Sequence, residues 1–470
     1  MFIIEFEQND RAPELRLAGV QESIGQYVHH TPNVFSFFLP EYSNPGQIND
    51  ASLKSPEAQV MNGPTNVGLL NGLFSLIDVG LSDCFGGFGG RTLNNCNTLY
   101  GNPEPYTNGV IKFQPTSTTS EGIVDELALL LTRGKLNQSA KTVIKNAYDA
   151  ESSANGADSA LRYATKLILT TPEFHGTNAM SEKGEDRPDP PNPVPSSNPY
   201  KAIVFLNLHG GMDGFQMLVP KDGCTKNGQS IDLYENYKAA RGDIALIKST
   251  LHSINVDNQV CSTFGLHSKL PDIKAMYDSG DLSFIANMGI LQQSGVTKEN
   301  YRKLHDKTAL FAHNTQTEET ANVDIYDEYA GIGICGRIID VLNKNGFNTG
   351  SLSVSGSAPP IVSRDTPLLV VNPFGLDKFH PNTAAKDVTS DAKKINGKSK
   401  AGSTFYGEAW SEALLQSLSE NALLNEKYNN AALTQEFENN HLERQLAAVA
   451  KLIMTKDDRG KDRDVFFLER

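Results

Sequence analysis

The sequence predicts an α/β protein, in which a sheet lies between helices, preceded by a mostly helical region. Residues 120–174 carry apolar side chains at helical spacing. Residues 181–199 are too rich in proline to join a core and are predicted to form a linker. After them, short apolar runs alternate with helical patterns, which is typical of a sheet with helices on its faces. We therefore expect a helical part over residues 1–180, a linker, and an α/β domain over residues 200–470.

Composition and charge narrow the classes of protein to which this chain can belong. The chain has 470 residues, 39% of them hydrophobic and 21% charged, as in a globular protein with two or three domains. Its net charge of -13 argues against nucleic acid as a partner, because binding a phosphate backbone needs a basic face. No apolar run approaches the roughly 20 residues that span a bilayer, so no transmembrane segment is expected.

The helical part shows clear patterns only in its second half. There, Gly134 ends one predicted helix, Ser139 is a candidate cap for the next, and Pro172 ends a third. Residues 40–120 are rich in Gly, Asn and Pro and are predicted to be loop-like. Because a plain loop of that length is unusual in a compact domain, we expect part of this domain to be missing.

The α/β domain is predicted from its apolar runs and helical patterns. Candidate strands are residues 202–208, 282–287, 351–355, 367–371 and 465–468. Candidate helices are residues 268–279, 298–310, 332–344 and 431–456. Ligands of open α/β sheets gather at the carboxyl ends of strands, so residues that follow these runs are the first candidates for a site.

The first apolar run ends in a glycine-rich turn, in "KAIVFLNLHGGMDG". Val204 to Leu208 are expected inside the sheet, and Gly210 and Gly211 let the backbone turn tightly beside a ligand. Asp213 then stands where a carboxylate can hold a divalent cation. The alternative is an ordinary Gly-Asp turn, in which Asp213 bonds its own backbone.

The stretch "GIGICG" at residues 331–336 matches the G-x-G-x-x-G pattern of dinucleotide sites. No buried strand precedes it, and no acidic residue lies about 20 positions further on, where the ribose contact is made. We therefore expect no nucleotide cofactor. The favoured interpretation is a helix through Arg337, Ile339 and Leu342, whose small residues allow close packing.

His267 and Thr297 lie at the starts of predicted helices. Ser268 is the candidate cap after His267, and a single histidine in such a place more often satisfies a hydrogen bond than ligates a metal. The same holds for His305 and His313. Thr297 is a candidate N-cap, and a hydroxyl there is also where a nucleophile that handles phosphate or sulfate gains from the helix dipole.

Five cysteines leave two disulfide pairings open. Cys84 with Cys96, and Cys224 with Cys261, are each candidates in an oxidising compartment, with Cys335 left single. If the protein is exported, we expect Cys224 and Cys261 to pair, because both flank the loop-rich stretch after the first strand.

Several blocks of the α/β domain occur in an order that resembles a known family. They are "VFLNLHGGMDGFQMLVP", "FGLHSKLPDIKAMYDSGDLSFIANMG", "TKENY", "LFAHNTQ", "GICGRIIDVL" and "SVSGSAPPIVSRDTPLLVVNPFG". Over residues 200–470 the chain resembles the domain-of-unknown-function 1501 family, which is similar to the alkaline phosphatase and sulfatase superfamily. The resemblance implies an alkaline phosphatase-like sheet flanked by helices, and a divalent metal ion for ester hydrolysis. It carries over Asp213 as a metal ligand, with His209 and His267 as further candidates.

The part before the linker resembles a second family. "PNVFSFFLPEYSNPG", "LALLLTRGKLNQSAKTVI" and "ALRYATKLILTTPEF" are similar to the closing part of the domain-of-unknown-function 1800 family. Because only that closing part is matched, we expect Met1 to be internal to a longer protein, and bacterial members of these families are often exported. At the other end, Arg470 comes just before a Gly-Gly-Phe/Trp-Asp-Thr-His-type motif of the first family. The α/β domain is therefore expected to be truncated at its C-terminal end and to lack its late metal ligands.

Two functions from different classes are expected. The first is an exported, hydrolase-like protein acting on phosphate or sulfate esters of a small molecule or polymer. In it, a metal held partly by Asp213 polarises the ester and Thr297 or another residue is the nucleophile. The second is a non-catalytic secreted or surface protein, binding or structural, that retains the hydrolase fold. In either case these 470 residues are expected to be inactive alone.

Overall fold

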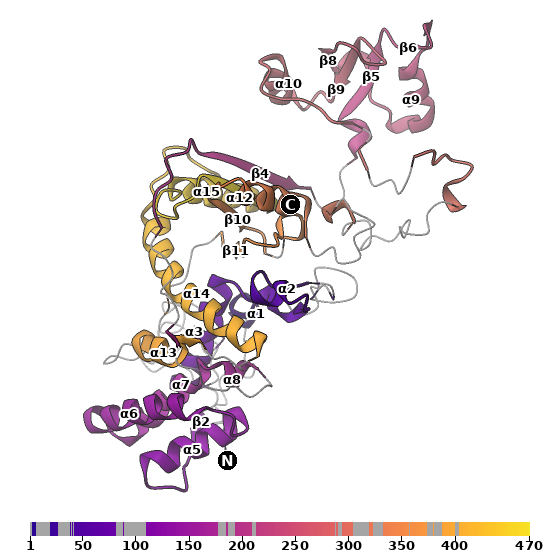
Figure 1. Cartoon of the computed structure of the whole chain (residues 1–470). Helices are drawn as coiled ribbons and strands as arrows, with labels where there is room; N and C mark the ends of the chain where they lie inside the picture. The colour runs from indigo at the N-terminus through magenta and orange to yellow at the C-terminus, as the bar shows by residue number, and fades with distance from the viewer. Residues whose placement is uncertain are drawn as a thin grey trace. The chain divides into compact units, whose positions relative to one another are not determined.

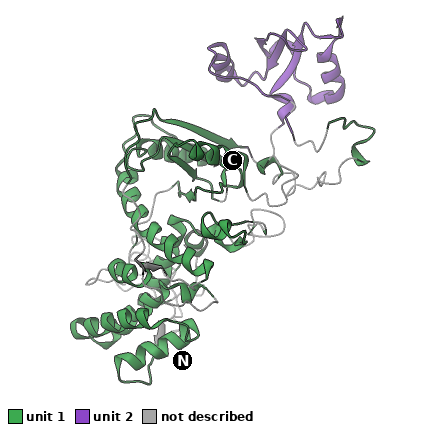
Figure 2. Cartoon of the chain, in the orientation of Figure 1, with its two compact units in different colours: residues 1–207, 291–470 green, residues 208–290 purple. Residues whose placement is uncertain are grey.

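The computed structural model divides the chain into two compact units. It describes residues 2–5, 19–26, 38, 40, 42–80, 88, 110–176, 185–186, 193–208, 213–286, 288–289, 294–303, 319–322, 332–356, 358–373, 379, 388–399 and 404–470. Unit 1 consists of residues 1–207 with 291–470, and unit 2 of residues 208–290 (Figure 2). The division predicted from the sequence, with a linker at residues 181–199, is a different one and stays a prediction.

Unit 1 contains packed helices and a parallel sheet (Figure 1). Its helices include α1 (Gly19–Ile24), α2 (Gln47–Asp50), α3 (Gly63–Val79), α5 (Ser120–Thr132), α6 (Gln138–Asn155), α7 (Ala157–Leu169), α8 (Pro172–His175), α12 (Ile334–Lys344), α13 (Val388–Asn396), α14 (Phe405–Asn430) and α15 (His441–Met454). Three short 3-10 helices are η1 (Pro56–Val60), η5 (Tyr301–Lys303) and η6 (Pro359–Ile361). Two antiparallel strand pairs join β1 (Phe2–Glu5) to β2 (Val110–Phe113) and β3 (Glu185–Asp186) to β12 (Lys398–Ser399).

The helices α5 to α8 confirm the helical pattern predicted before the linker. α5 ends where Arg133 and Gly134 adopt left-handed backbone angles, with φ of 56° and 73°. α6 begins at Asn137, whose side chain accepts a hydrogen bond from the Ala140 N–H at 2.8 Å. The prediction that Ser139 caps this helix is therefore wrong, because Ser139 already lies in its first turn.

α3 lies in the stretch that the sequence predicted to be loop-like, so that prediction is wrong for residues 63–79. Asn62 and Thr65 form a capping box in which each side chain accepts the other's backbone N–H at 3.3 Å. Leu70 and Phe74 are fully buried. Glycine and asparagine interrupt the apolar period of this helix, so tertiary burial rather than propensity accounts for it.

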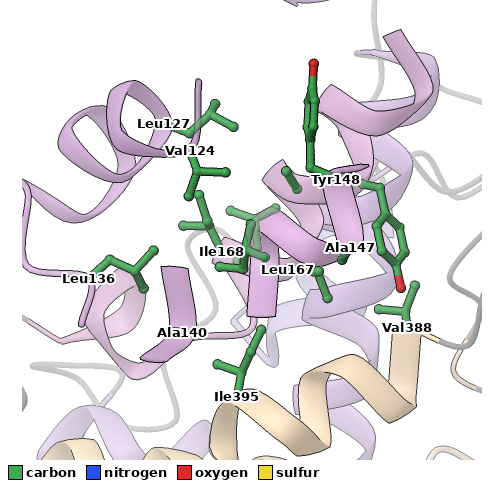
Figure 3. Packing of buried hydrophobic residues seen from close by; sticks show 14 of the residues in the cluster. Val124, Leu127, Leu136, Ala140, Ala147, Tyr148, Leu167, Ile168, Val388 and Ile395 are labelled. Atoms are coloured by element: carbon green, nitrogen blue, oxygen red, sulfur yellow. The ribbon is translucent and has the colours of Figure 1, made fainter. Parts of the chain in front are cut away.

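The helices of unit 1 share one hydrophobic core (Figure 3). Its buried members include Val124, Leu127, Leu136, Ala140, Ala147, Tyr148, Leu167 and Ile168, together with Val388 and Ile395 of α13. The first half of α14 adds Trp410, Leu414 and Leu418 to the same cluster. Segments from before and after the predicted linker therefore pack together within unit 1.

His175, at the end of α8, packs against the single tryptophan of the chain. Its ring stacks on Trp410 with centroids 3.6 Å apart and meets Phe174 edge-on at 4.9 Å. Its Nε2 lies 2.8 Å from the carbonyl oxygen of Leu169. Burial lowers the pKa of His175 from 6.5 to about 4, because the charged imidazolium loses hydration in this setting.

The larger sheet has four parallel strands in the order β11–β10–β13–β4. They are β4 (Lys201–Asn207), β10 (Thr349–Ser353), β11 (Leu368–Val370) and β13 (Arg463–Glu469). The strands predicted at residues 202–208, 351–355, 367–371 and 465–468 are thus confirmed. Residues 281–286 form no strand, so the prediction at residues 282–287 is wrong for the part that is described.

Helices cover both faces of this sheet, as the predicted α/β class requires. On one face, α15 and the second half of α14 pack against Phe466 and Leu468 of β13. On the other face, α12 and η6 pack against Val465 and Phe467. The alternation along β13 is that of a central strand buried on both sides.

Among the described residues, β4 is one of the two edge strands of the sheet, contrary to the prediction that Val204 to Leu208 lie inside it. Its apolar side chains stay accessible: Ile203 is 41%, Val204 45% and Leu206 42% exposed. A continuous apolar run predicts a strand but does not fix its place in the strand order.

α12 confirms the structural interpretation of the "GIGICG" stretch. A Cβ atom on Gly333 would lie 2.2 Å from the Pro359 carbonyl oxygen, and one on Gly336 would lie 1.8 Å from that of Val362. The glycines therefore allow the helix to touch the neighbouring backbone, which is a packing role.

The long helix predicted at residues 431–456 is wrong in its first third. α14 ends at Asn430, residues 431–440 are not helical, and α15 begins after Asn440, whose side chain accepts the Glu443 N–H at 3.0 Å. α14 itself was not predicted, because its apolar residues serve two cores and follow no single stripe.

Unit 2 is built on a three-stranded antiparallel sheet in the order β5–β9–β8. Its elements are η2 (Gly214–Gln216), β5 (Leu218–Asp222), β6 (Thr225–Lys226), β7 (Gln229–Ser230), α9 (Leu233–Arg241), η3 (Gly242–Ile244), η4 (Lys248–Thr250), β8 (His252–Asn255), β9 (Thr263–Leu266) and α10 (Pro271–Asp278). The predicted disulfide is confirmed: Cys224 and Cys261 are bonded, with Cα atoms 3.7 Å apart. Cys335 is a buried free thiol, and Cys84 and Cys96 lie outside the described residues.

Candidate functional site

Asp213 caps a short helical turn at the start of unit 2. Its Oδ1 accepts a hydrogen bond from the Phe215 N–H at 3.1 Å, and its carbonyl oxygen accepts one from the Gln216 N–H at 3.0 Å. These bonds start η2, directly before β5. The geometry is that of the alternative weighed for the sequence, a turn in which Asp213 bonds its own backbone.

The second oxygen of Asp213 is engaged by Arg241, the last residue of α9. The guanidinium Nη2 donates to Oδ2 in an ion pair, and the guanidinium carbon lies 5.7 Å from the centre of the Phe215 ring. Arg241 is partly buried while Asp213 is more open, with side-chain exposures of 21% and 38%. The carboxylate therefore has a protein partner on each oxygen, one of them a full positive charge.

His267 lies at the same end of the unit 2 sheet as Asp213. Its N–H donates to the Met217 carbonyl oxygen at 3.3 Å, next to the start of β5. Its Nδ1 accepts a hydrogen bond from the Lys269 N–H at 3.0 Å, so this nitrogen is engaged by the local backbone. The prediction that Ser268 caps α10 is wrong, because the N-cap position is Leu270 and no side chain bonds there.

Thr297 is an exposed turn residue. Its Oγ1 accepts from the Glu299 N–H at 3.3 Å, and its own N–H donates to Asn300 Oδ1 at 2.6 Å. The helical turn that follows is the three-residue η5, so the predicted helix at residues 298–310 is described only in part. The hydroxyl thus serves a local backbone bond.

The described residues do not form a ligand set for a divalent metal. No group of three or more His, Cys, Asp or Glu side chains in the described ranges is arranged to hold one. Asp213 is occupied by Arg241, and His209 lies outside the described residues, as do His305 and His313. We therefore assign no chemical step to a metal at these positions.

The chain matches no protein-family model, no curated protein and no solved structure. The resemblance to the domain-of-unknown-function 1501 and 1800 families and the alkaline phosphatase-like fold therefore stay predictions. The expected absence of a nucleotide cofactor and the expected absence of a nucleic-acid partner also stay predictions. Among the described helices, none is both long and apolar enough to cross a bilayer.

A second candidate site, which the sequence did not predict, is an apolar surface at the edge of the parallel sheet. We define the edge surface by exposed apolar residues on both faces of the sheet at this edge: Ile203 of β4 with Ile334, Ile338 and Val341 of α12 on one face, and Val204 and Leu206 of β4 on the other. The three α12 residues are 37%, 39% and 58% exposed and recur at helical spacing. Their i, i+4, i+7 spacing was visible in the sequence, but which side of the helix the sheet covers was not.

Proposed function

We propose that this chain is a non-catalytic binding or structural protein that retains a hydrolase-like α/β fold. The observation that carries the proposal is the state of Asp213, whose two carboxylate oxygens are held by the Phe215 N–H and by Arg241. To bind a metal, this carboxylate would have to lose a charged partner and a turn-capping bond. Its present contacts stabilise the entry to β5 instead.

The other described candidates support the same conclusion. His267 and Thr297 each accept a hydrogen bond from a backbone N–H two residues further on. Such bonds shape loops and need no ligand. Each of the three predicted residues that the structure describes thus has a local structural role.

Export remains part of the proposal. What supports it is the Cys224–Cys261 bond, since disulfides persist in secreted and periplasmic proteins and are rare in the cytosol of most organisms. An extracellular or surface location suits a binding or structural protein as well as it suits a hydrolase.

Metal-dependent hydrolysis of phosphate or sulfate esters is the second candidate function. It is favoured by the sequence position of Asp213, six residues after the last residue of β4, a parallel strand of an α/β sheet. In this alternative, His209 and residues beyond the described ranges complete the ligand set, and Thr297 or another hydroxyl attacks the ester.

Turnover assays separate the two functions. The purified chain is incubated with p-nitrophenyl phosphate or p-nitrophenyl sulfate and Zn²⁺, Mn²⁺ or Mg²⁺, beside Asp213→Asn and the matched control Asp243→Asn, an exposed acid of η3. We expect product formation at the background rate in all three proteins. Metal-dependent turnover that Asp213→Asn abolishes and Asp243→Asn spares would establish the hydrolase instead.

The structural role of Asp213 has its own readout. Asp213→Ala removes a turn cap and an ion pair, and we expect it to lower the free energy of unfolding of unit 2 by about 1 kcal/mol. A double-mutant cycle with Arg241→Ala should give a coupling energy of about 0.2–1 kcal/mol, the range for partly exposed ion pairs. Strictly additive effects would show that the pair does not hold Asp213 in place.

A further inference from the structure

We propose that Asn227, at the tip of the β6–β7 hairpin of unit 2, is a site of spontaneous deamidation. Its side-chain amide is converted to an acid through a cyclic imide formed with the backbone nitrogen of Gly228. This inference goes beyond the proposed function, because it concerns a covalent change of the chain and not the Asp213 turn.

The reaction needs an asparagine whose side chain can meet the backbone nitrogen of the next residue. That nitrogen loses its proton to a base, attacks the side-chain carbonyl carbon and expels ammonia, which closes a succinimide ring. Water then adds to either ring carbonyl and breaks its bond to the nitrogen, giving aspartate or isoaspartate. A glycine in the second position favours ring closure, because it has no Cβ to obstruct the attack and its backbone is the least restricted.

The chain contains seven Asn-Gly pairs, so the dipeptide alone does not select one of them. They begin at Asn62, Asn71, Asn108, Asn155, Asn227, Asn345 and Asn396. The pair at residues 108–109 lies outside the described residues. For the other six pairs, the structure shows what holds the side chain and the backbone.

Two of the pairs belong to α3. Asn62 is the N-cap of this helix and accepts the Thr65 N–H at 3.3 Å, whereas Asn71 lies inside the helix. Because the backbone from Gly63 onward is helical, ring closure at either asparagine requires the helix to unwind locally. Both positions are therefore expected to react slowly in the folded chain.

The side chains of three further pairs are held by hydrogen bonds. Asn155 donates to Glu151 Oε1 and Asn345 donates to the Val341 carbonyl oxygen, each at 2.7 Å. Asn396 is 1% exposed, and its Nδ2 donates to two carbonyl oxygens at 3.0 and 3.2 Å. Attack by the following nitrogen requires these bonds to break first, which slows the reaction at each of the three.

Asn227 is in a different setting, because it forms a two-residue hairpin turn with Gly228. Their φ angles of 52° and 77° are those of a type I′ turn. Every residue from Thr225 to Ser230 is exposed, and no hydrogen bond within the described residues holds the Asn227 side chain. Lys226 and Gln229 form the closing pair of the ladder, so the Gly228 N–H is left outside it.

Ring closure also needs the backbone to rotate at Asn227, and the short hairpin allows this rotation. β6 and β7 have 2 residues each, and a ladder of that size is marginally stable in water. The base of the hairpin is held separately, by the Cys224–Cys261 bond and by the Thr225 N–H, which donates to the Val260 carbonyl oxygen at 2.8 Å. The tip can therefore open while the rest of unit 2 stays folded.

Peptide mapping of the full chain by mass spectrometry tests the site. The folded protein is incubated in mildly alkaline buffer, then digested at acid pH, where ring closure stops, and the acid form of each Asn-Gly pair is measured over time. We expect conversion at Asn227 to be at least about tenfold faster than at Asn155, Asn345 or Asn396, because an engaged side chain reacts only after local opening. The same incubation in urea is the control, since without folded structure the rates should converge.

The chemical route has its own readout. Methyl transfer from S-adenosylmethionine by an isoaspartyl methyltransferase should label the Asn227 peptide, because opening of the ring gives isoaspartate as well as aspartate. Three results would each overturn the proposal. They are conversion at Asn227 no faster than at the engaged pairs, a lead of Asn227 that is equally large in urea, and aspartate without isoaspartate, which would mean direct hydrolysis of the side-chain amide.

Discussion

Acidification should destabilise the helical core of unit 1 through His175. The pKa of His175 is lowered by burial from 6.5 to about 4, so the unfolded chain takes up the proton before the folded one does. The contribution of His175 to the free energy of unfolding is therefore fully present well above pH 6.5. It falls as the pH drops toward 4, by up to about 1.4 kcal/mol per pH unit.

The size of the effect follows from the two pKa values. Between pH 7 and pH 4.5, they give a loss of at most about 2.4 kcal/mol in the free energy of unfolding. The side chain of His175 keeps partial contact with solvent, which screens the penalty, so we expect about 1–2 kcal/mol. Other acids titrate in the same range, and a variant is needed to isolate this one group.

The assay uses Trp410, the single tryptophan, whose ring stacks on His175. Urea unfolding is followed by its fluorescence at pH 7 and pH 4.5, in the natural chain and in His175→Gln, which keeps a donor for the Leu169 carbonyl but does not titrate. The variant should lose about 1–2 kcal/mol less than the natural chain on acidification. Equal losses in the two proteins would refute the assignment.

Two further predictions concern packing and the disulfide. Replacing both Cys224 and Cys261 by serine should lower the free energy of unfolding of unit 2 by about 3–4 kcal/mol, because the bond spans a sequence separation of 37. Amide hydrogen exchange in β9 measures this loss of stability, and unchanged protection of the β9 amides would contradict the prediction. Gly336→Ala should cost at least about 2 kcal/mol, since its Cβ would overlap a backbone carbonyl. Gly214→Ala, which meets nothing within 4 Å, is the control, and similar melting temperatures for both variants would show that α12 is not closely packed.

Periodicity predicted the elements of unit 1 better than their arrangement. The stripes of α5 to α7 and the apolar runs of β10 and β13 are properties of local sequence, and each was found near its predicted place. The edge position of β4 was missed because an apolar run looks the same in a central strand and in an edge strand. α3 was missed because its burial comes from helices distant in the sequence.

The contacts of the site residues likewise depend on tertiary structure that the local sequence does not determine. The sequence allowed two roles for Asp213, metal ligand or turn residue, and the local sequence did not decide between them. What distinguishes them in the structure is Arg241, which lies 28 residues further along and meets Asp213 only through the fold of unit 2. No motif signals such a pair, because an ion pair between distant positions depends on tertiary placement and not on spacing.

Metal content tests the central claim most directly. The full chain and Asp213→Asn are each equilibrated with Zn²⁺, Mn²⁺ and Mg²⁺, desalted and measured by mass spectrometry of the retained metal. Because Arg241 and the Phe215 N–H occupy the carboxylate, we expect no retained metal that depends on Asp213. One equivalent of metal in the natural chain that disappears in Asp213→Asn would contradict the account and return this residue to a catalytic metal site.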